Sequence, residues 1–559
     1  MVTKEASRLC GIILENDFGA VVAKVGQTVL EYGRLPLPLI SRYAEIKAKQ
    51  VRAALLILIQ HNCMWHCQTD NDEFFETNAD EILARIRFGR YIRYAIDSYK
   101  DKLESRCAGE MITTVLLNGK LRSGDIFERM PADIDETTMK KVLVQFLNTA
   151  AFTKSTPIMH VSPRDKTLLY EKEIKDTTYK KSDILGPKDI KKIKELAQAR
   201  LLQELQVERG EVLEDGTRAG MKRKKSSSKR GEDVITFDLT RSKENAYFRV
   251  NYEHYNVRLR NRLIAAEAAK RWNEQSGLIM EAFLRATEET KKDTQNHVHD
   301  TISELVAIHQ VAKYIPQENT LKKGIVLSNK ENNVQKLVAE YCQILSSQDF
   351  PGPAGASTRF LQKAGSSKEY HVCYETVCAR IKRSLVDSLV KEQFGDEAAR
   401  IINIVLEKGK LEEKHISTIG LLSMKETRET IGKLQTSGLL QLQEVPKSAD
   451  RAVHRTFYLW YVDLPKAYLG LSAKLYKTIA NLIERKQRER KIRADVLARA
   501  DRKDVREDSS LLAKSDKDRL EELKHIIELL DVAILRSDAA TFVLRDLPGG
   551  PSSQFSIGE

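Results

Sequence analysis

The most constraining feature of this chain is a pattern of apolar residues around a glycine that occurs three times. It reads V-L-x-x-G-(K/R)-L-x-x-x-x-I, with the glycine at Gly33, Gly119 and Gly409. We interpret Val-Leu as the last apolar turn of a helix, which ends at the glycine because the chain enters a left-handed conformation there. A basic residue that points outward and a leucine that points inward then form a short extended step. Each copy therefore predicts a helix, a short strand and a second helix.

The second helix of each copy is anchored by the isoleucine seven positions after the glycine. We expect it to be the first buried residue of that helix: Ile40, Ile126 and Ile416. An amphipathic third helix is predicted to follow each copy, with its end near residues 58–63, 147–152 and 434–439.

Hairpins are predicted after two of these third helices. Their β-prone strands are 64–67 with 73–77, and 439–442 with 455–461. Three helices and a two-stranded wing make a winged helix, a relative of the helix-turn-helix. A similar third-helix end at 345–350 has no recognisable opening motif, so we count three clear units and one degenerate unit.

A polar, basic stretch separates the second unit from the degenerate one. It holds 19 Lys/Arg and 12 Asp/Glu between Arg164 and Arg230, with one helix-like piece at 189–206. Few apolar residues and an excess of one charge are typical of disordered segments. We therefore predict an exposed, disordered insertion outside the folded cores.

The sequence changes character beyond Pro465. Apolar residues step by three and four in two stretches that a polar break separates, first Leu475, Ile479 and Leu482, then Leu520, Leu523, Ile527, Leu530 and Ile534. Two helices that fold back on each other explain both stripes.

The predicted fold class is mainly α, with tandem winged helices, small β-wings and a C-terminal helical hairpin or coiled coil. A chain of 559 residues is too long for a single core. The predicted divisions are winged helix 1 at 1–95, winged helix 2 at 96–163, the basic insertion at 164–231, the end of winged helix 2 with winged helix 3 at 232–372, winged helix 4 at 373–465, and the hairpin with its tail at 466–559.

Motifs of independent enzymes are missing. The sequence lacks a phosphate-binding G-x-x-x-x-G-K-(S/T) loop, a G-x-G-x-x-G turn, H-E-x-x-H and a nucleophile elbow. The longest apolar run, 53–59, is too short to cross a bilayer, and the N-terminus has no signal segment. Seven scattered cysteines argue against a disulfide framework. We expect a protein of a reducing compartment with no catalytic residues and no cofactor.

One group of residues has the composition of a zinc site. His61, Cys63, His66 and Cys67 carry the usual zinc ligands. His66 and Cys67 are adjacent, however, so on a strand they point to opposite faces, and no second ligand pair follows. The spacing favours residues of the wing and the third-helix end over metal ligands.

The formal net charge of +13 permits contact with phosphate backbones. Candidate contacts on the third helices are Lys47, Lys49, Arg52, Lys140, Lys141, Lys425 and Arg428, and candidates in the last wing and the insertion are Arg451, Arg455, Lys222, Arg223, Lys224 and Lys225. Glu426 and Glu429 dilute the last third helix, which favours contact without base reading. The cluster 222–230 fits a nuclear import signal, a phosphate-contacting arm or a solvated charge run.

The order of these parts resembles one family. A basic insertion in the second winged helix, a final helical hairpin and the segment Tyr247 to Asn261 (YFRVNYEHYNVRLRN) are similar to the third-largest subunit of eukaryotic RNA polymerase III. The opening stretch 9–15, the first motif and the stretch 56–62 (LILIQHN) resemble the N-terminal part of that family. Arg249-Val250-Asn251 is the most distinctive short motif.

The resemblance implies a nuclear, non-catalytic subunit. Such a subunit forms a subcomplex with two smaller polymerase III-specific subunits, docks on the clamp of the core enzyme and assists promoter opening and initiation at small RNA genes such as those for tRNA and 5S rRNA. Its nucleic-acid partner is double-stranded and partly melted promoter DNA, bound without strong sequence specificity, and no membrane partner is expected. The alternative is a scaffold whose winged helices bind only proteins. The charge and the repeated units favour the first interpretation.

Overall fold

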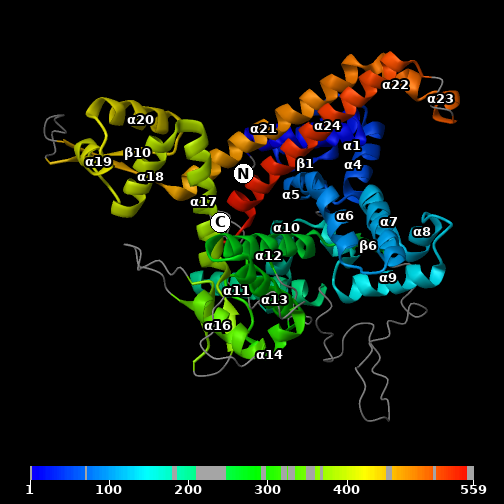
Figure 1. Ribbon diagram of the computed structural model, residues 1–559. Coiled ribbons are helices and arrows are strands. Elements are labelled where there is room, and N and C mark those ends of the chain that lie inside the picture. The colour runs from blue at the N-terminus through cyan, green and yellow to red at the C-terminus, as the bar shows by residue number, and fades with distance from the viewer. Residues whose placement is uncertain are drawn as a thin grey trace, which may run out of the picture. The chain divides into compact units, whose positions relative to one another are not determined.

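The computed structural model describes most of the chain and divides it into two compact units. The described residues are 3–68, 72–178, 186–208, 247–290, 297–315, 324, 334–347, 359–365, 369–447, 456–507 and 512–549. Unit 1 comprises residues 1–255 and 292–295, and unit 2 comprises residues 256–291 and 296–559. Among the described residues, no helix combines the length and apolar composition that a bilayer span requires. Each unit is described by itself below (Figure 1).

Winged helix 1 opens unit 1 as the sequence predicts. Its elements are α1 (Lys4–Phe18), α2 (Ala20–Tyr32), β1 (Leu35–Pro36), α3 (Leu37–Ala44), α4 (Ala48–Gln60), β2 (Met64–Gln68) and β3 (Glu73–Thr77). The predicted wing is confirmed, with Met64 paired to Thr77 and Gln68 to Glu73. Helices α5 (Ala79–Ala84) and α6 (Phe88–Asp97), joined by a short 3-10 turn, lead into the next domain.

The three repeated glycines lie where the motif predicts. Gly33, Gly119 and Gly409 follow the ends of α2, α7 and α18, with φ of 82°, 78° and 84°. The three isoleucines of the motif are fully buried. A residue with a Cβ resists this backbone conformation, so glycine ends the helix at little cost.

Winged helix 2 completes unit 1 with a sheet whose strands are far apart in sequence. Its elements are α7 (Lys102–Asn118), β4 (Leu121–Arg122), α8 (Ser123–Glu128), α9 (Glu136–Asn148), β5 (Phe152–Ser155) and β6 (Tyr247–Val250). Strand β6 lies between β4 and β5. The insertion therefore interrupts the wing, between its two strands.

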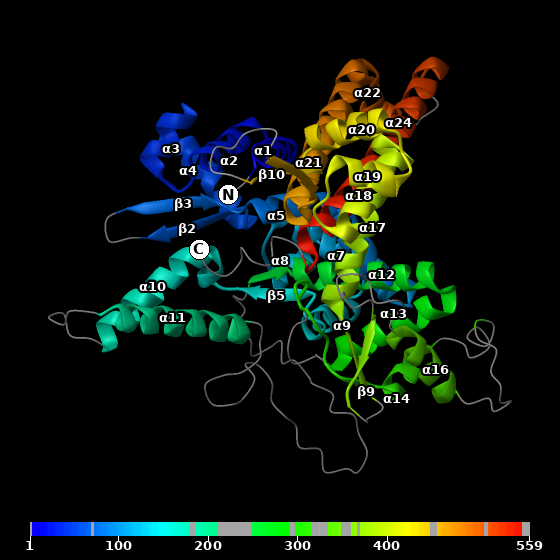
Figure 2. The same cartoon turned by 90° about the vertical axis from the view of Figure 1, so that its left-hand side faces the viewer.

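The prediction of disorder over 164–231 is wrong for the described part of the insertion. Helices α10 (Pro163–Thr178) and α11 (Pro187–Glu208) pack side by side (Figure 2). Ile193 and Ala197 are buried, and the Arg200 guanidinium lies 4.9 Å from the centre of the Tyr170 ring. A few well-placed apolar side chains thus suffice for a helical pair, although the average composition is polar. Residues 209–246, including the basic cluster, lie outside the described residues.

Winged helix 3 is the degenerate unit. Its elements are α13 (Glu274–Thr290), β7 (Val306–Ala307), α14 (Ile308–Val311), α16 (Val334–Ser346), β8 (Leu361–Lys363) and β9 (Glu369–Val372), and α12 (Tyr252–Arg271) precedes it in the chain. The strand order β7-β9-β8 matches β1-β3-β2 and β4-β6-β5 of the first two winged helices. The opening motif is missing because a connection of some fifteen residues, 291–305, separates α13 from its strand.

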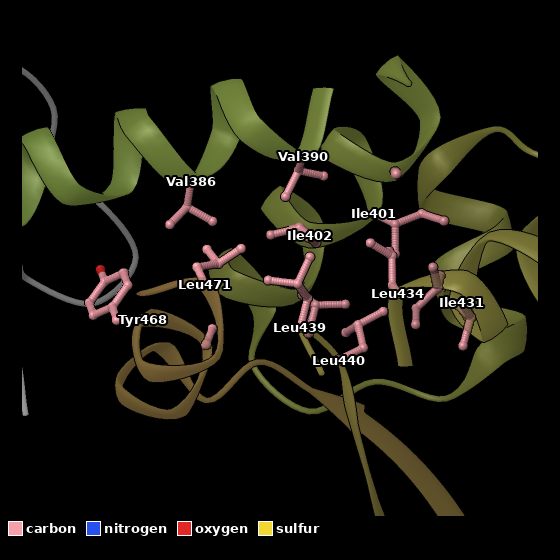
Figure 3. Close-up of a cluster of buried hydrophobic side chains, with 14 of the residues drawn as sticks. Val386, Val390, Ile401, Ile402, Ile431, Leu434, Leu439, Leu440, Tyr468 and Leu471 are labelled. Carbon is pink, nitrogen blue, oxygen red and sulfur yellow. The ribbon is translucent and has the colours of Figure 1, made fainter. Parts of the chain in front are cut away.

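Winged helix 4 has a core of its own. Its elements are α17 (Tyr374–Phe394), α18 (Asp396–Lys408), α19 (Glu413–Gly420), α20 (Met424–Thr436), β10 (Gln441–Pro446) and β11 (Thr456–Tyr461). A bridge from Leu411 to Trp460 replaces the short third strand. Figure 3 shows the buried cluster that these elements form. Ile401, Ile402, Leu434 and Leu439 lie in one core with Val386 and Val390 of α17 and with Leu471 of α21 (Leu464–Ile492).

The C-terminal hairpin is confirmed. Helix α21 (Leu464–Ile492) and helix α24 (Lys514–Thr541) pack along each other (Figure 1), with α22 (Ala494–Ala500) and α23 (Lys503–Glu507) between them in sequence. Lys486 Nζ lies 2.6 Å from Asp531 Oδ1 across the pair. A final π-helical turn (Phe542–Asp546) follows α24, and the buried Lys382 Nζ donates to the Leu547 carbonyl (2.8 Å).

Candidate nucleic-acid interface

The third helix of winged helix 1 presents three unpaired cations. Lys47, the N-cap residue of α4, and Lys49 and Arg52 on the helix are exposed, while Val51, Leu55 and others form the buried face. Across the described part of the chain, no carboxylate lies within ion-pair distance of these three side chains.

The N-terminal position of these cations is electrostatically unfavourable for the helix itself. A helix N-terminus carries partial positive charge, which acidic side chains offset. The first turn of α4 has no acidic residue, and its N-cap residue accepts no side-chain hydrogen bond. An external anion, such as a phosphate, would offset this charge through the free backbone N–H groups and the three side chains.

The corresponding cations of winged helix 2 are paired within the protein. On α9, Lys140 Nζ lies 2.7 Å from Glu136 Oε1, and Lys141 is ion-paired with Glu104. Helix α9 also has Glu136 in its first turn, which suits the helix dipole. Lys140 and Lys141 lie on the surface, but the carboxylates of Glu136 and Glu104 already offset their charges.

Winged helix 4 is neutralised in a similar way. Helix α20 begins with a capping box of Ser423 and Glu426, a favourable arrangement for its N-terminus. Arg428 is ion-paired with Glu413, and Lys433 Nζ lies 2.8 Å from Glu429 Oε1. The hydrogen bond from Lys433, helped by the charge of Lys425, lowers the pKa of Glu429. Of the described candidates, only those of α4 form a set without internal partners.

Six candidates fall outside the described residues. They are Arg451 and Arg455 of the last wing, and Lys222, Arg223, Lys224 and Lys225 of the insertion. Their contact with nucleic acid stays a prediction from sequence.

The outward orientation predicted for the basic residue of the motif is wrong for Lys120. Lys410 is exposed, but Lys120 is only 7 % exposed, and its Nζ lies 2.6 Å from His160 Nε2. Burial, helped by the charge of Arg249, lowers the pKa of Lys120 to about 8. Burial and the neighbouring Lys120 lower the pKa of His160 to about 4, so a neutral imidazole accepts the hydrogen bond from the ammonium at pH 7.

Lys120 is buried because the turn that holds it is a joint between winged helices 1 and 2. Gln60, at the end of α4, donates its Nε2 hydrogens to the carbonyls of Asn118 (3.1 Å) and Lys120 (2.8 Å). A Cβ at Gly119 would lie 2.4 Å from the Gln60 carbonyl oxygen. The end of α4 is thereby fixed to the second winged helix. The glycine motif around Gly119 does not indicate that Gln60 lies beside the turn.

The suspected zinc residues lie at the same junction. His61 packs its ring 4.6 Å from that of Phe18, and Cys63 is fully buried. Burial lowers the pKa of His61 to about 4 and raises the pKa of Cys63 to about 12. Within the described ranges no three His, Cys, Asp or Glu side chains form a group that could hold a metal ion. A thiol held protonated by burial is a poor ligand, because metals bind the thiolate.

The distinctive segment Tyr247 to Asn261 is architectural. In β6, Phe248 and Val250 are buried, and the Asn251 amide donates to the Ala150 carbonyl (2.9 Å) while its oxygen accepts from the backbone N–H of Glu253 (3.2 Å). In unit 2, the fully buried Arg260 lies 3.7 Å from the centre of the Tyr374 ring and donates to the carbonyl of His297. The segment closes one sheet and starts the next domain.

Three family models match the chain. They describe the helix-turn-helix domain of RNA polymerase III subunit RPC82 (residues 8–67), RNA polymerase III subunit RPC82 (141–380) and the C-terminal winged-helix domain of POLR3C (386–462). These ranges cover parts of winged helices 1 and 4 and most of the chain between the middle of winged helix 2 and α17.

Curated relatives align along almost the whole length. The chain is 24% identical to DNA-directed RNA polymerase III subunit RPC3 of Rattus norvegicus and 23% identical to that of Homo sapiens, over 97% of this chain and 98% of each relative. It is 25% identical to the same subunit of Danio rerio over the same shares. The chain belongs to the RPC82/RPC3 family, the winged-helix third-largest subunits of RNA polymerase III.

Proposed function

We propose that this chain is a non-catalytic, nuclear subunit of RNA polymerase III that docks on the clamp of the core enzyme together with two smaller specific subunits. There it lies close to promoter DNA and assists its opening during initiation at small RNA genes such as those for tRNA and 5S rRNA. The family and the full-length alignment to polymerase III subunits support the assembly part of the proposal. The chain supplies no catalytic residue and no cofactor.

The observation that carries the DNA-proximal part is the unpaired basic end of α4. Lys47, Lys49 and Arg52 stand on one exposed helix end without internal carboxylates. Phosphate contacts of this kind position a protein on DNA without reading its sequence. We therefore expect the basic end of α4 to contact duplex and partly melted DNA of any sequence.

The alternative, a scaffold that binds only proteins, is favoured for winged helices 2 and 4. Their third-helix cations are held by Glu136, Glu104 and Glu413. We therefore assign DNA contact to winged helix 1 first and protein contact to the other two.

Two measurements test the proposal. A tagged chain purified from nuclear extract is expected to bring down polymerase III subunits, identified by mass spectrometry; recovery of a different assembly contradicts the subunit role. Binding to duplex and bubble DNA is then titrated with salt. A steep loss of affinity supports phosphate contact, whereas weak binding at every salt concentration supports the protein-only scaffold.

The basic cluster of the insertion is tested separately. Deletion of residues 221–230 is expected either to flatten the salt dependence by a few units, at roughly 0.9 per phosphate contact, or to move the protein to the cytoplasm. The first result assigns an arm that contacts phosphate, and the second assigns an import signal. If neither property changes, the cluster is a solvated linker.

A further inference from the structure

A polar groove of about 600 Å³ lies along α17 in unit 2, and residues of α12 and α18 complete its walls. Helix α17 contributes a stripe of polar residues spaced by three and four, from Arg380 to Lys391, while Val386 and Val390 of the same helix enter the core of winged helix 4. Five basic and three acidic side chains line the groove. Its size is that of a site for a small ligand or a few residues of a peptide.

The charges at the two ends of the groove are paired. Arg380 Nε lies 3.3 Å from Glu267 Oε1 at the α12 end, and Lys391 Nζ lies 2.8 Å from Asp396 Oδ1 at the α18 end. These ion pairs bridge the helices that form the walls. A ligand would therefore bind in the middle of the groove, between the two ion pairs.

Two cations in the middle form hydrogen bonds to neutral groups and, among the described residues, no ion pair. Lys270 Nζ donates to the Ser384 hydroxyl at 3.4 Å, and Arg383 donates to the Asn403 amide oxygen at 3.2 Å. No carboxylate within the described ranges lies at ion-pair distance from either side chain. A carboxylate from outside would therefore gain charge-assisted hydrogen bonds to both.

Asp387 stands among these cations with an unused acceptor. Its Oδ1 is buried and accepts no hydrogen bond from the described residues. Burial raises the pKa of Asp387, although the charge of Arg383 acts against the shift. The Asp387 carboxyl group also lines the groove, so a ligand that supplies an N–H or O–H donor can hydrogen-bond to it there.

We propose that the middle of this groove binds a polypeptide segment of a partner protein. The segment places an acidic side chain between Lys270 and Arg383 and donates a hydrogen bond to Asp387. A phosphate backbone fits less well, because its phosphates carry acceptors only and cannot donate a hydrogen bond to the Asp387 carboxylate. A peptide supplies both a carboxylate and backbone N–H donors within a few ångströms of each other.

The first test uses a fluorescent peptide of alternating glutamate and glycine, with its glutamine counterpart and a thymidine oligonucleotide as competing probes. The purified full chain is expected to bind the glutamate peptide more tightly than the glutamine peptide. The double variant Lys270→Gln, Arg383→Gln should weaken binding roughly tenfold, since both charge-assisted bonds are lost. The matched control Lys477→Gln, Lys491→Gln removes two cations from exposed positions of α21 and should change binding by less than about twofold.

Direct competition separates peptide from phosphate. The thymidine oligonucleotide should displace the fluorescent glutamate peptide far more weakly than the unlabelled glutamate peptide does, because its phosphates offer no hydrogen-bond donor to Asp387. An oligonucleotide that displaces the peptide equally well overturns the proposal. Equal binding of the glutamate and glutamine peptides, or insensitivity to the double variant, also overturns it. Arg383→Lys, which keeps the charge, should retain most of the binding and shows that the groove is still folded.

The second test locates the partner in the assembled complex. A photo-cross-linking amino acid at Ser388, a groove residue, is expected to trap a polypeptide within or next to an acidic stretch. A cross-link to nucleic acid, or none at all, contradicts the proposal. The groove and α4 are separate sites, so this result stands apart from the DNA titration that tests the proposed function.

Discussion

Winged helices 2 and 4 carry the same glycine motif, yet the two copies have opposite surroundings. In winged helix 2 the turn is buried against the end of α4, and Lys120 donates to a histidine. In winged helix 4 a Cβ built at Gly409 meets, apart from the adjacent residues, no atom of the described chain within 4 Å, and Lys410 is exposed. The motif thus determines the backbone of the turn and the position of the next helix, while the neighbouring domain determines what the turn does.

The third helices of winged helices 1 and 4 also differ in the groups that surround their charges. Helices α4 and α20 occupy equivalent places in their domains, but α20 has a capping box and paired cations whereas α4 has neither. Folds of this kind serve many functions, so function follows from the local charges rather than from the winged helix itself.

Substitution of the motif glycines gives the largest expected contrast. Gly119→Ala must adopt a left-handed backbone and also pushes a Cβ against the Gln60 carbonyl, so we expect a loss of roughly 2–4 kcal/mol in the free energy of unfolding of unit 1. Gly409→Ala should cost only about 1 kcal/mol, because its Cβ meets open space.

The three tryptophans allow these effects to be measured separately. Trp65 lies in winged helix 1 and Trp460 in winged helix 4, so fluorine NMR of 5-fluorotryptophan protein in urea reports each domain by its own signal. If Gly119→Ala and Gly409→Ala shift their signals by equal amounts, the joint between winged helices 1 and 2 does not exist as described.

How far sequence predicts this molecule follows from the range over which each feature is determined. The helix end at Gly33, the extended step and the burial of Ile40 are set by a few adjacent residues, and all three were predictable. The burial of Lys120 was not, because it depends on Gln60, which is distant in sequence.

Average composition is a poor predictor of structure in the insertion. Average polarity predicted disorder for α10, but Asp165 at its start is buried and forms a 2.6 Å ion pair with Arg34. The α4 cations were predictable as candidates, but their lack of partners was not, since Lys140 looks equally available in sequence. The α17 groove left no sequence signal, because its walls come from three separate helices.

The comparison of α4 with α20 predicts a large difference in DNA binding. Lys47→Gln, Lys49→Gln and Arg52→Gln together should lower affinity for duplex DNA tens of fold at low salt and flatten the plot of log affinity against log salt by about 3 units. The matched triple Lys425→Gln, Arg428→Gln, Lys433→Gln should change the slope by only about 1 unit, because the charges of Arg428 and Lys433 are already paired and only Lys425 has no ion pair among the described residues. Equal effects of the two triples would return DNA contact to all winged helices alike.

Lys120 and Lys410 predict different responses to alkaline pH. The pKa of Lys120 is lowered from 10.5 to about 8 in the folded protein. Between these values the unfolded chain binds more protons than the folded chain, so the free energy of unfolding of unit 1 rises as pH increases through this window. Lys120→Met should abolish that rise in the Trp65 signal, and Lys410→Met should leave it intact. An unchanged rise in Lys120→Met would assign it to another group.

The smallest expected difference is in the stability of unit 1 and winged helix 4 at acidic pH. His61 and His160 are both held near pKa 4 in the folded protein, against an ordinary value of 6.5. The unfolded chain therefore takes up their protons first as pH falls, and unit 1 loses stability between pH 6.5 and 4. His160→Gln keeps an acceptor for Lys120 but cannot titrate, so it should remove part of this loss and leave the share of His61. The Trp460 signal serves as the internal control, since neither histidine belongs to winged helix 4. If His160→Gln loses stability over this range as steeply as the unsubstituted protein, His160 is not buried as a neutral partner of Lys120, and the joint between winged helices 1 and 2 is looser than its hydrogen bonds indicate.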